Sequence, residues 1–500
     1  MQNCQPKIKL KEGNSLASGL VLHTIAKIIF LLTGYAMHMY LGKTLSAAQY
    51  GIIGVIISIN NINYNFLSQG ARQAASRALA ERHYNEQDII KKSFMIQFVA
   101  MMLLFLATIL FAEFYSSVLN VPGMSRYIRM TALVIPAMAG YFLTLGVLNG
   151  YKLFIAEACI MILYSLMRLS VIPFVGYVFE DSTQGTIAGF FASAVAALIV
   201  GTTIATRLYK RADKDKPRIS HSRYVGYVTG FLTFFLCIAV MLSLDMFFIN
   251  AMLDTQDLVG YYTGATNFAK ITYFLLSAVY IVALPIITQK YSADDFQGCS
   301  QTINQFFKVI ALFILPIPCI VAPLAGNLMA SFYTPEYRAA AIPTAILLFS
   351  QFFIGFMVVL NIFLCAASGR KFSAIVAVYT LALDAVLCFV MIPRYSITGA
   401  ATSTLIAGVF GCAVTVVKLR QVYKNLWDRT LSILIVSCMA WMTALAIVAR
   451  YLTTDSFILS LAQCAVAYVL FLLIVWSLRI ASPIKIILEL KSQTSATDLP

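Results

Sequence analysis

Charged and polar side chains interrupt two apolar stretches of the sequence. Residues 23–40 read HTIAKIIFLLTGYAMHMY, so His23, Lys27 and His38 stand among aliphatic and aromatic residues. Lys270 stands in a second stretch, GYYTGATNFAKITYFLL. If these stretches cross a bilayer, each lysine near its centre costs roughly 2.5 to 3.5 kcal/mol on insertion scales. Such a cost predicts a role for the charge, and the chemistry of an ammonium group points to an anionic ligand.

Polar residues recur on one face of several stretches when they are drawn as helices with 100° per residue. His23, Lys27, Gly34 and His38 fall within an arc of about 60°. The other aligned sets are Ser58, Asn61, Asn65, Ser68 and Arg72; Glu157, Tyr164 and Arg168; and Thr263, Thr266, Lys270, Tyr273 and Ser277. These faces predict contact with the protein interior or a wet cavity, because lipid would leave their hydrogen-bonding groups unpaired.

Each set also has a purely structural explanation. The Asn61 and Asn65 face could hold helices together, and the histidines could serve as hydrogen-bonded packing residues. The two lysines could pair with buried carboxylates. Glu157 and Arg168 are too far apart on one helix to touch, so each needs a partner elsewhere, unless Glu157 reaches water. These alternatives remain open at the level of sequence.

Two acidic residues lie at matched depth in two other apolar stretches. Asp245 and Asp384 stand eight and nine residues before the outer ends of the predicted spans 224–253 and 372–393. Nearly equal depth makes a shared ion site possible. The alternative is that Lys270 or Arg168 neutralises one of the carboxylates.

Composition settles which elements position these side chains. Of the 500 residues, 60% are hydrophobic and 11% are charged, and the mean hydropathy is +0.83. A soluble globule cannot hide so much apolar surface, so the sequence predicts an all-α polytopic membrane protein. Spans of about 20 residues or more cross the hydrocarbon layer. Fourteen can be placed, at 16–41, 47–69, 93–114, 127–149, 153–179, 184–206, 224–253, 258–288, 302–330, 339–368, 372–393, 397–417, 430–451 and 456–478.

The basic residues predict the orientation. If the N-terminus is cytoplasmic, 26 of the 36 Lys and Arg residues fall on that side of the membrane. Only five, Lys43, Arg126, Arg338, Arg394 and Arg450, fall outside. This asymmetry predicts cytoplasmic termini. It also accounts for the net charge of +15 without nucleic-acid binding, and the basic loops should favour anionic membrane lipids.

The longest basic loop divides the chain. We expect an N-terminal lobe at 1–206, a cytoplasmic linker at 207–223, a C-terminal lobe at 224–417, and two further spans with a tail at 418–500. The ten cysteines are scattered and form no CxxC pair, so neither a disulfide framework nor a zinc site is predicted.

Four short motifs resemble those of a transporter family. They are LGKTLSAAQYG at 41–51, QGARQAASRALAE at 69–81, LVGYYTGATNFAK at 258–270 and ALP at 283–285. Together with the fourteen spans, they are similar to polysaccharide-lipid flippases of the multidrug/oligosaccharidyl-lipid/polysaccharide exporter superfamily. The resemblance implies a V-shaped transporter of two six-helix lobes plus two helices, without enzymatic activity.

The resemblance also implies a substrate. It would be an undecaprenyl-diphosphate-linked oligosaccharide, moved by alternating access across a bacterial cytoplasmic membrane for cell-surface polysaccharide or cell-wall synthesis. Partners would be a polysaccharide polymerase and glycosyltransferases, and the transporter would be a monomer. We expect a basic cleft in which substrate meets Lys27, Lys270, Arg168, Arg72, Asn61, Asn65, His23, His38 and Tyr273.

No organic cofactor is expected, but a coupling ion is. In the lipid II flippases that this chain resembles, acids of spans 7 and 11 hold sodium with help from span 12. Asp245 and Asp384 match these acids, Thr380 stands where an amide is expected, and Thr402 is a candidate ligand from span 12. Either Na⁺ or H⁺ would fit the expectation.

Two other functions compete with the flippase. A cation-coupled multidrug exporter of the same superfamily would favour acids and aromatic residues for cationic drugs, which the lysines near the midplane oppose. A membrane glycosyltransferase or polymerase usually needs a large extramembrane loop or an acidic motif near the interface. No loop here exceeds about 25 residues.

Overall fold

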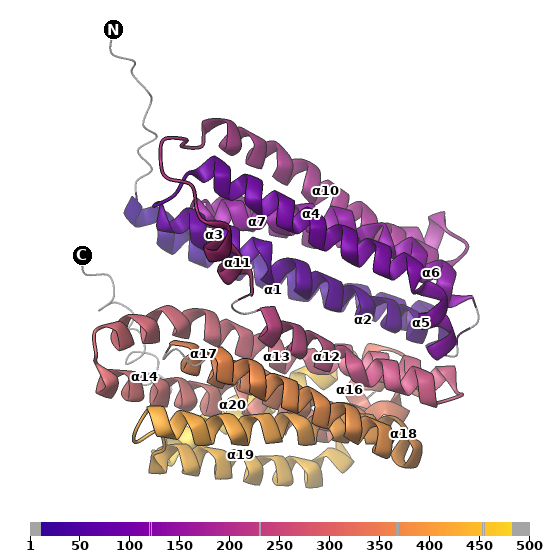
Figure 1. Ribbon diagram of the computed structural model, residues 1–500. Coiled ribbons are helices and arrows are strands. Elements are labelled where there is room, and N and C mark those ends of the chain that lie inside the picture. Colours follow the sequence, from indigo (N-terminus) through magenta and orange to yellow (C-terminus); the bar gives the residue numbers. More distant parts are fainter. Residues whose placement is uncertain are drawn as a thin grey trace. The chain divides into compact units, whose positions relative to one another are not determined.

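The computed structural model describes residues 12–482, apart from 120, 122, 230–231, 367–369, 453 and 455. Every regular element among these residues is helical, with short 3₁₀ and π turns between longer α-helices. This confirms the all-α class predicted from composition (Figure 1).

The number of membrane crossings also agrees with the sequence. Among the described residues, eleven helical runs are long and apolar enough to cross a membrane. One of them, Lys371–Val422, turns back at Ser396, where φ is 53° and ψ is −139°, and therefore crosses twice. Helices α2 and α13 coincide with the second and eighth predicted spans but carry more polar residues. The fourteen-helix membrane fold is thus confirmed.

The packing divides the chain into two compact units. Unit 1 comprises Met1–Leu41 and Ile56–Leu236, and unit 2 comprises Gly42–Val55 and Cys237–Pro500. The basic segment 207–223 lies within unit 1. The short hairpin formed by the end of α1 and the start of α2 belongs to unit 2, where Gly51 meets Gly260 and Gly54 meets Thr263.

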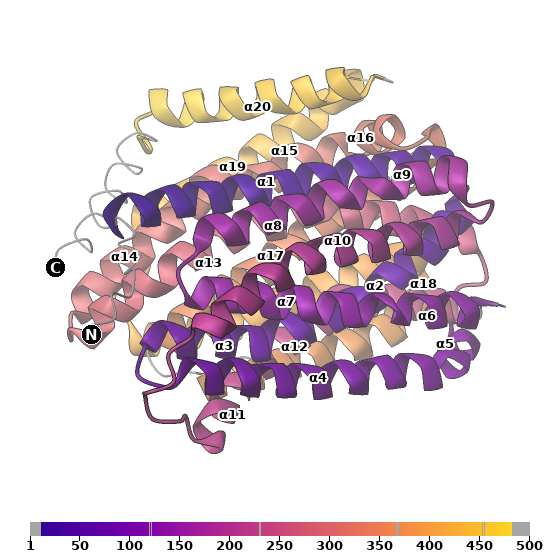
Figure 2. The same ribbon diagram turned by 90° about the horizontal axis from the view of Figure 1, so that it is seen from above.

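Helix α7 is central to unit 1. It packs against α3, α4 and α10, and Figure 1 shows α4, α7 and α10 running together. Helices α8 and α9 run beside α1 in Figure 2. The helices are α1 (Glu12–Thr44), α2 (Ala47–Gln69), α3 (Ala71–Glu81), α4 (Glu86–Leu110), α5 (Ala112–Val118), α6 (Met124–Ala132), α7 (Val134–Gly150), α8 (Phe154–Met167), α9 (Val171–Pro173), α10 (Ser182–Arg211) and α11 (His221–Thr229).

The span that contains α8 and α9 is irregular. A 3₁₀ turn at Arg168–Ser170 separates the two helices, and a π turn at Phe174–Val178 follows Pro173. Proline has no N–H to donate, so the hydrogen-bond pattern of the helix cannot continue through it unchanged. The break places Arg168 at an interruption of the helix, beside α1.

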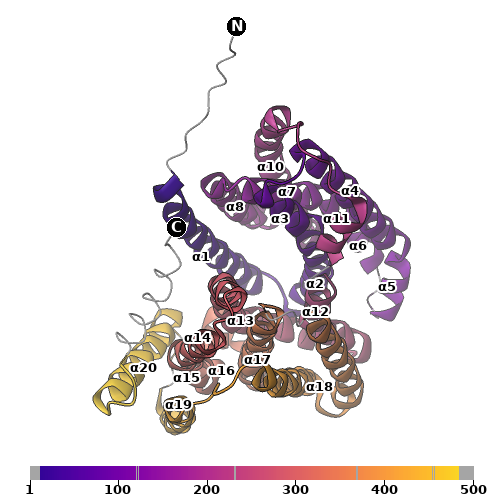
Figure 3. The same ribbon diagram turned by 60° about the vertical axis from the view of Figure 1, so that its left-hand side comes forward.

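Helix α17 is the corresponding centre of unit 2. It packs against α13 on one side and α18 on the other, as Figure 3 shows. Helix α20 packs against α15, α16 and α19. The helices are α12 (Leu232–Met252), α13 (Gln256–Ser292), α14 (Phe296–Val309), α15 (Pro316–Val321), α16 (Ala325–Phe332), α17 (Ala341–Ala366), α18 (Arg370–Val422), α19 (Arg429–Val448) and α20 (Phe457–Ser477).

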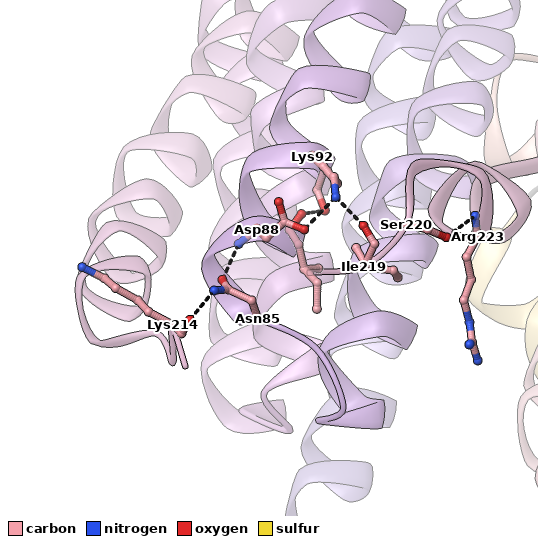
Figure 4. A network of polar contacts seen from close by, with 9 residues as sticks. Asn85, Asp88, Lys92, Lys214, Ile219, Ser220 and Arg223 are labelled. Atoms are coloured by element: carbon pink, nitrogen blue, oxygen red, sulfur yellow. Dashed lines mark hydrogen bonds and ion pairs between the residues drawn. The ribbon is translucent and has the colours of Figure 1, made fainter. Parts of the chain in front are cut away.

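The basic segment between α10 and α11 is fastened to the start of α4. Asn85 donates from its backbone N–H to the carbonyl of Pro217 at 2.9 Å and from Nδ2 to the carbonyl of Lys214 at 2.6 Å. Lys92 bonds both Asp88 and the carbonyl of Ile219, as Figure 4 shows. The segment therefore follows a fixed path along unit 1, with its carbonyl groups turned toward α4.

The carboxylate of Asp213, in the same segment, interacts with groups two and three residues further along the chain. The backbone N–H of Asp215 and the ammonium of Lys216 hold the pKa of Asp213 below its usual value. Asp213 thus remains ionised near neutral pH. Its own N–H and carbonyl bond Glu86, which also accepts a 2.8 Å hydrogen bond from Tyr151.

Candidate functional site

A charged cluster lies inside unit 1 where α1, α3 and α8 meet. Arg72 on α3 approaches Oε1 of Glu157 with Nη2 at 3.4 Å. The Glu157 side chain is fully buried, and its second oxygen accepts a 2.8 Å hydrogen bond from Nδ2 of Asn149. Ser76 donates to Oδ1 of Asn149 at 2.6 Å and so orients the amide. Glu157 therefore does not reach water, and both of its oxygens have partners.

Lys27 and His23 belong to the same cluster. Both lie close enough to Arg72 and Glu157 to interact with them electrostatically. Among the described residues, no carboxylate lies within salt-bridge distance of the Lys27 ammonium. The single negative charge of Glu157 is directed at Arg72, so the cluster keeps an excess of positive charge. This is the arrangement that an anionic headgroup requires.

The other predicted residues of unit 1 are placed differently. Asn65 donates from Nδ2 to the backbone carbonyl of Asn61 at 2.9 Å, so that amide bonds its own helix. His38 is half-buried on α1. Arg168 contacts α1 through the carbonyl of Phe30 at 2.7 Å and lies with Cζ 4.3 Å from the centre of the Phe30 ring. Lys27, His23 and Arg72 thus lie in one cluster. Arg168, in the turn after α8, contacts α1 further along, at Phe30.

A pair of carboxylates lies inside unit 2. Asp245 on α12 is 1% exposed and accepts a 2.6 Å hydrogen bond from the hydroxyl of Tyr262 on α13. Its other oxygen accepts the backbone N–H of Met246 at 2.8 Å. Asp384 on α18 is fully buried and lies close enough to Asp245 to interact with it electrostatically. The two acids that share a depth in the sequence are therefore neighbours in space.

Asp384 has an open oxygen. Oδ1 accepts a weak 3.8 Å contact from Sγ of Cys388, while Oδ2 is buried and has no hydrogen-bond partner. The hydroxyl of Thr404, in the second limb of α18, bonds the carbonyl of Ala400 in its own helix at 3.2 Å. A buried carboxylate oxygen without a partner, within electrostatic reach of a second carboxylate, suits a hard cation such as Na⁺. The residues present therefore fit a monovalent cation, which Asp245 and Asp384 would hold.

The remaining predicted residues of unit 2 surround this pair less closely. Lys270 donates to Oδ1 of Asn267 at 3.5 Å and lies close enough to Asp245 to attract its carboxylate. Thr380 contacts Sδ of Met357 at 3.9 Å, and Thr402 bonds the carbonyl of Thr398 in its own helix. Tyr273 is half-buried and packs edge-on against Phe274.

Several residues of these clusters were not predicted from the sequence. Asn149 and Tyr262 donate hydrogen bonds to the buried acids Glu157 and Asp245. Tyr262 lies in the LVGYY motif, which offered a signal. Asn149 approaches Glu157 from another helix, so no helical spacing links the two residues. In the part of the chain that the structure describes, no three His, Cys, Asp or Glu side chains form a metal-binding group.

Comparison with known sequences identifies the family. A family model described as polysaccharide biosynthesis protein matches residues 16–291, which is more than half of the chain. A second model, MatE, matches residues 218–390. No curated protein sequence matches the chain.

Solved structures share the fold. The lipid II flippase MurJ in an inward closed conformation superposes with a TM-score of 0.70 and 15% identity, covering 92% of this chain and 100% of MurJ. An inward-facing multidrug resistance MATE family transporter of the MOP superfamily superposes with a TM-score of 0.65 and 13% identity, covering 81% of this chain and 99% of that transporter. A MOP superfamily transporter from Pyrococcus furiosus superposes with a TM-score of 0.60 and 12% identity, covering 84% of this chain and 99% of that transporter. All three of these proteins are transporters or flippases, and none is an enzyme. This chain belongs to the polysaccharide biosynthesis protein family and has the multi-pass membrane fold of MOP superfamily transporters.

Proposed function

We propose that this protein moves an undecaprenyl-diphosphate-linked oligosaccharide from the inner to the outer leaflet of a bacterial cytoplasmic membrane. The match to polysaccharide biosynthesis proteins supports a glycan substrate, and the fold shared with a lipid II flippase supports a lipid-linked one. The glycan itself is not specified by these observations.

The cluster of unit 1 carries the proposal. Lys27, Arg72 and His23 gather around Glu157, and that one carboxylate is already occupied by Arg72 and Asn149. A diphosphate carries about two negative charges, and taking it into a low-dielectric interior without compensating charge is very costly. An excess of fixed positive charge within the membrane-spanning helices lowers that cost. We propose that Lys27 and Arg72 contact the diphosphate directly.

Lys270 extends the same chemistry to unit 2. Its ammonium contacts only the amide oxygen of Asn267 at 3.5 Å among the hydrogen bonds of the described residues, so it retains donors for a ligand. An ammonium is a compact point charge with three donors, which suits phosphate oxygens in more than one orientation. We include Lys270 among the residues that contact the headgroup during transport.

The acid pair of unit 2 is assigned to coupling. We propose that Asp245 and Asp384 bind Na⁺ or H⁺ and that this binding returns the empty transporter to the state that accepts substrate from the cytoplasm. The open Oδ2 of Asp384 supports this role. A ligand shifts a conformational equilibrium only by its difference in affinity for the two states, so the acids must bind the ion more tightly in one of them.

The orientation completes the proposal. We place both termini and the basic segment 207–223 in the cytoplasm, because basic residues accumulate on the cytoplasmic side of membrane proteins. The hydrogen bonds of that segment to Asn85 and Glu86 hold it beside the start of α4, which supports a common location for its cations.

The test is transfer of a fluorescent undecaprenyl-diphosphate-linked sugar across proteoliposomes. Lys27→Gln should lose most of the transfer rate, whereas Lys27→Arg should keep part of it, because charge matters more than shape. The same order should hold at Lys270. Arg129→Gln serves as a control, since Arg129 is half-exposed and paired with the exposed Glu113. Monodisperse Lys27→Gln and Lys270→Gln proteins that transfer substrate at the parental rate would contradict the assignment.

A cation-coupled multidrug exporter is the second candidate. The MatE model matches residues 218–390, which include both Asp245 and Asp384. The same proteoliposomes can be loaded with a fluorescent cationic dye. Dye export that depends on the acid pair, together with no transfer of the lipid-linked sugar, would favour the exporter.

A further inference from the structure

Arg168 is a buried cation without a counter-ion. The residue is 9% exposed, and its described hydrogen bonds, both from Nη2, go to the carbonyl of Phe30 and, at 3.4 Å, to the hydroxyl of Thr33. Nε is buried and donates to nothing. No carboxylate of the described chain lies within salt-bridge distance of the guanidinium. A buried charge without a partner is costly, so the surroundings of Arg168 need an explanation.

Three tyrosines lie in the same part of the interior. Tyr164 stacks on the Phe30 ring that Arg168 covers, and Tyr141 stacks on Tyr164. Tyr164, Tyr141 and Tyr64 are also the titratable side chains within electrostatic reach of Arg168. The hydroxyl of Tyr64 is buried and has no hydrogen-bond partner, and no hydrogen bond of Tyr141 or Tyr164 is formed within the described residues. Tyrosine hydroxyls can donate as well as accept. Nε of Arg168 and the three tyrosine hydroxyls are thus donors with no described acceptor.

The rings and the backbone hold this arrangement in place. Tyr141 and Tyr164 stack with centroids 5.0 Å apart, and Tyr164 stacks on Phe30 at 6.5 Å. At Gly34 a Cβ atom would lie 2.7 Å from Nη2 of Arg168, so the absence of a side chain there makes room for the guanidinium. This explains Gly34 in the polar face of α1. The donors are therefore preorganised rather than mobile.

We propose that Arg168 and the hydroxyls of Tyr64, Tyr141 and Tyr164 bind one small anion inside unit 1. Every unsatisfied group here can donate a hydrogen bond and the net charge is positive, which is the complement of an anion. Tyr141 and Tyr164 are only 4% and 6% exposed, so an anion held by them would be largely shielded from water.

This anion site adjoins the diphosphate cluster, because Tyr64 and Tyr141 pack against Phe142 and Cζ of Arg72 lies 6.0 Å from the centre of the same ring. Phe30 and Thr33 lie one to two helical turns beyond Lys27 on α1, about 5 to 9 Å along its axis. The anionic group has two sources with the same chemistry: a free ion such as chloride, or an anionic group of the bound substrate. The second source rests on the proposed function, whereas the first does not.

The test measures the thermal midpoint of the detergent-purified full-length protein. Replacing sodium gluconate by sodium chloride at constant ionic strength should raise the midpoint by about 2 °C or more, saturably, because only the folded state binds the ion. Sodium bromide should act in the same way. In a separate arm, undecaprenyl diphosphate is added in gluconate without chloride.

Two variants separate binding from folding. Tyr64→Phe removes an unpartnered hydroxyl and keeps the ring against Phe142, so in gluconate it should be at least as stable as the parental protein. In chloride it should lose most of the anion-dependent shift. Arg168→Gln should abolish the shift. Tyr115→Phe is the control, because Tyr115 is exposed and lies far along the chain from the site.

Each outcome decides the proposal. A Tyr64-dependent shift in chloride assigns the site to a free anion. A Tyr64-dependent shift with undecaprenyl diphosphate alone assigns it to the substrate. If the parental protein and Tyr64→Phe respond equally to chloride and equally to undecaprenyl diphosphate, the site binds no anion, and the failure would leave the Lys27 and Lys270 assay unaffected.

Discussion

The hydroxyl of Tyr262 donates a 2.6 Å hydrogen bond to Oδ2 of Asp245 in the interior of unit 2. Tyr262 is fully buried and Asp245 is 1% exposed, so water does not compete for this bond. With the N–H of Met246 on Oδ1, it fixes the plane of the carboxylate. The tyrosine of the LVGYY motif thus orients an acid on the preceding helix.

Tyr262→Phe should therefore weaken unit 2. Removing the donor leaves one oxygen of a buried carboxylate unpaired, which should lower the free energy of unfolding by about 1 to 3 kcal/mol. Thermal or denaturant unfolding in detergent measures the change. Tyr261→Phe is the neighbouring control, because the Tyr261 ring packs against Tyr337 and its hydroxyl makes no described hydrogen bond. Equal stability of both variants would show that the bond to Asp245 contributes little.

Neutralising the acid pair should remove cation dependence. Asp245→Asn and Asp384→Asn keep the size of each side chain and remove its charge, so a cation loses its main ligands. Transfer in proteoliposomes should no longer respond to sodium or proton gradients, while binding of the lipid-linked substrate persists. The controls are Thr380→Val and Thr402→Val, whose hydroxyls contact Met357 and Thr398 and make no described contact with the acids. Unchanged gradient dependence in both Asn variants would remove the ion assignment.

The pair of Arg72 and Glu157 should show coupling in a double-mutant cycle. Arg72→Gln leaves a fully buried carboxylate without its cation, at a cost of about 1 to 3 kcal/mol, reduced because the arginine side chain is 23% exposed. Glu157→Gln should cost less, because the amide can still bond Asn149. The double variant should be more stable than the sum of the single losses predicts. Additive losses by chemical denaturation would mean that the 3.4 Å contact carries no energy.

The membrane-spanning helices, and the buried charged residues that they carry, could be predicted from the sequence. Apolar runs and the placement of Lys and Arg predict fourteen spans, and the break at Ser396 falls between the predicted spans 372–393 and 397–417. Matched depth makes a shared ion site of Asp245 and Asp384 possible, and the two buried carboxylates lie within electrostatic reach of each other, but their joint binding of an ion stays a prediction. These features follow from periodicity and length, which are local properties of a chain.

Partners on other helices could not be predicted. The Asn149 amide bonds Glu157 because α7 and α8 are joined by a tight turn. Such contacts depend on the rotation of one helix about its axis relative to another, and the sequence pattern does not fix that angle. For the same reason the sequence did not link Tyr64 and Tyr141, which lie on other helices, to Arg168, whereas Tyr164 shares a helical face with it.

Asn85 should control the stability of the basic segment between α10 and α11. Its Oδ1 accepts the N–H of Asp88 at 2.8 Å and caps α4, while its Nδ2 holds the carbonyl of Lys214 at 2.6 Å (Figure 4). Asn85→Ala loses both bonds, so we expect about 1 to 2 kcal/mol of destabilisation and faster hydrogen exchange at the amide of Asp213. Lys214→Ala is the matched control, because Lys214 contributes its backbone carbonyl and its side chain is exposed. Hydrogen exchange with mass spectrometry measures both variants in detergent. Since Ile219 and Tyr224 remain buried against Ala78 and Leu79, the loosening should stop before residue 219. Exchange that is unchanged in Asn85→Ala, or that rises equally in Lys214→Ala, would show that the apolar contacts alone hold the segment.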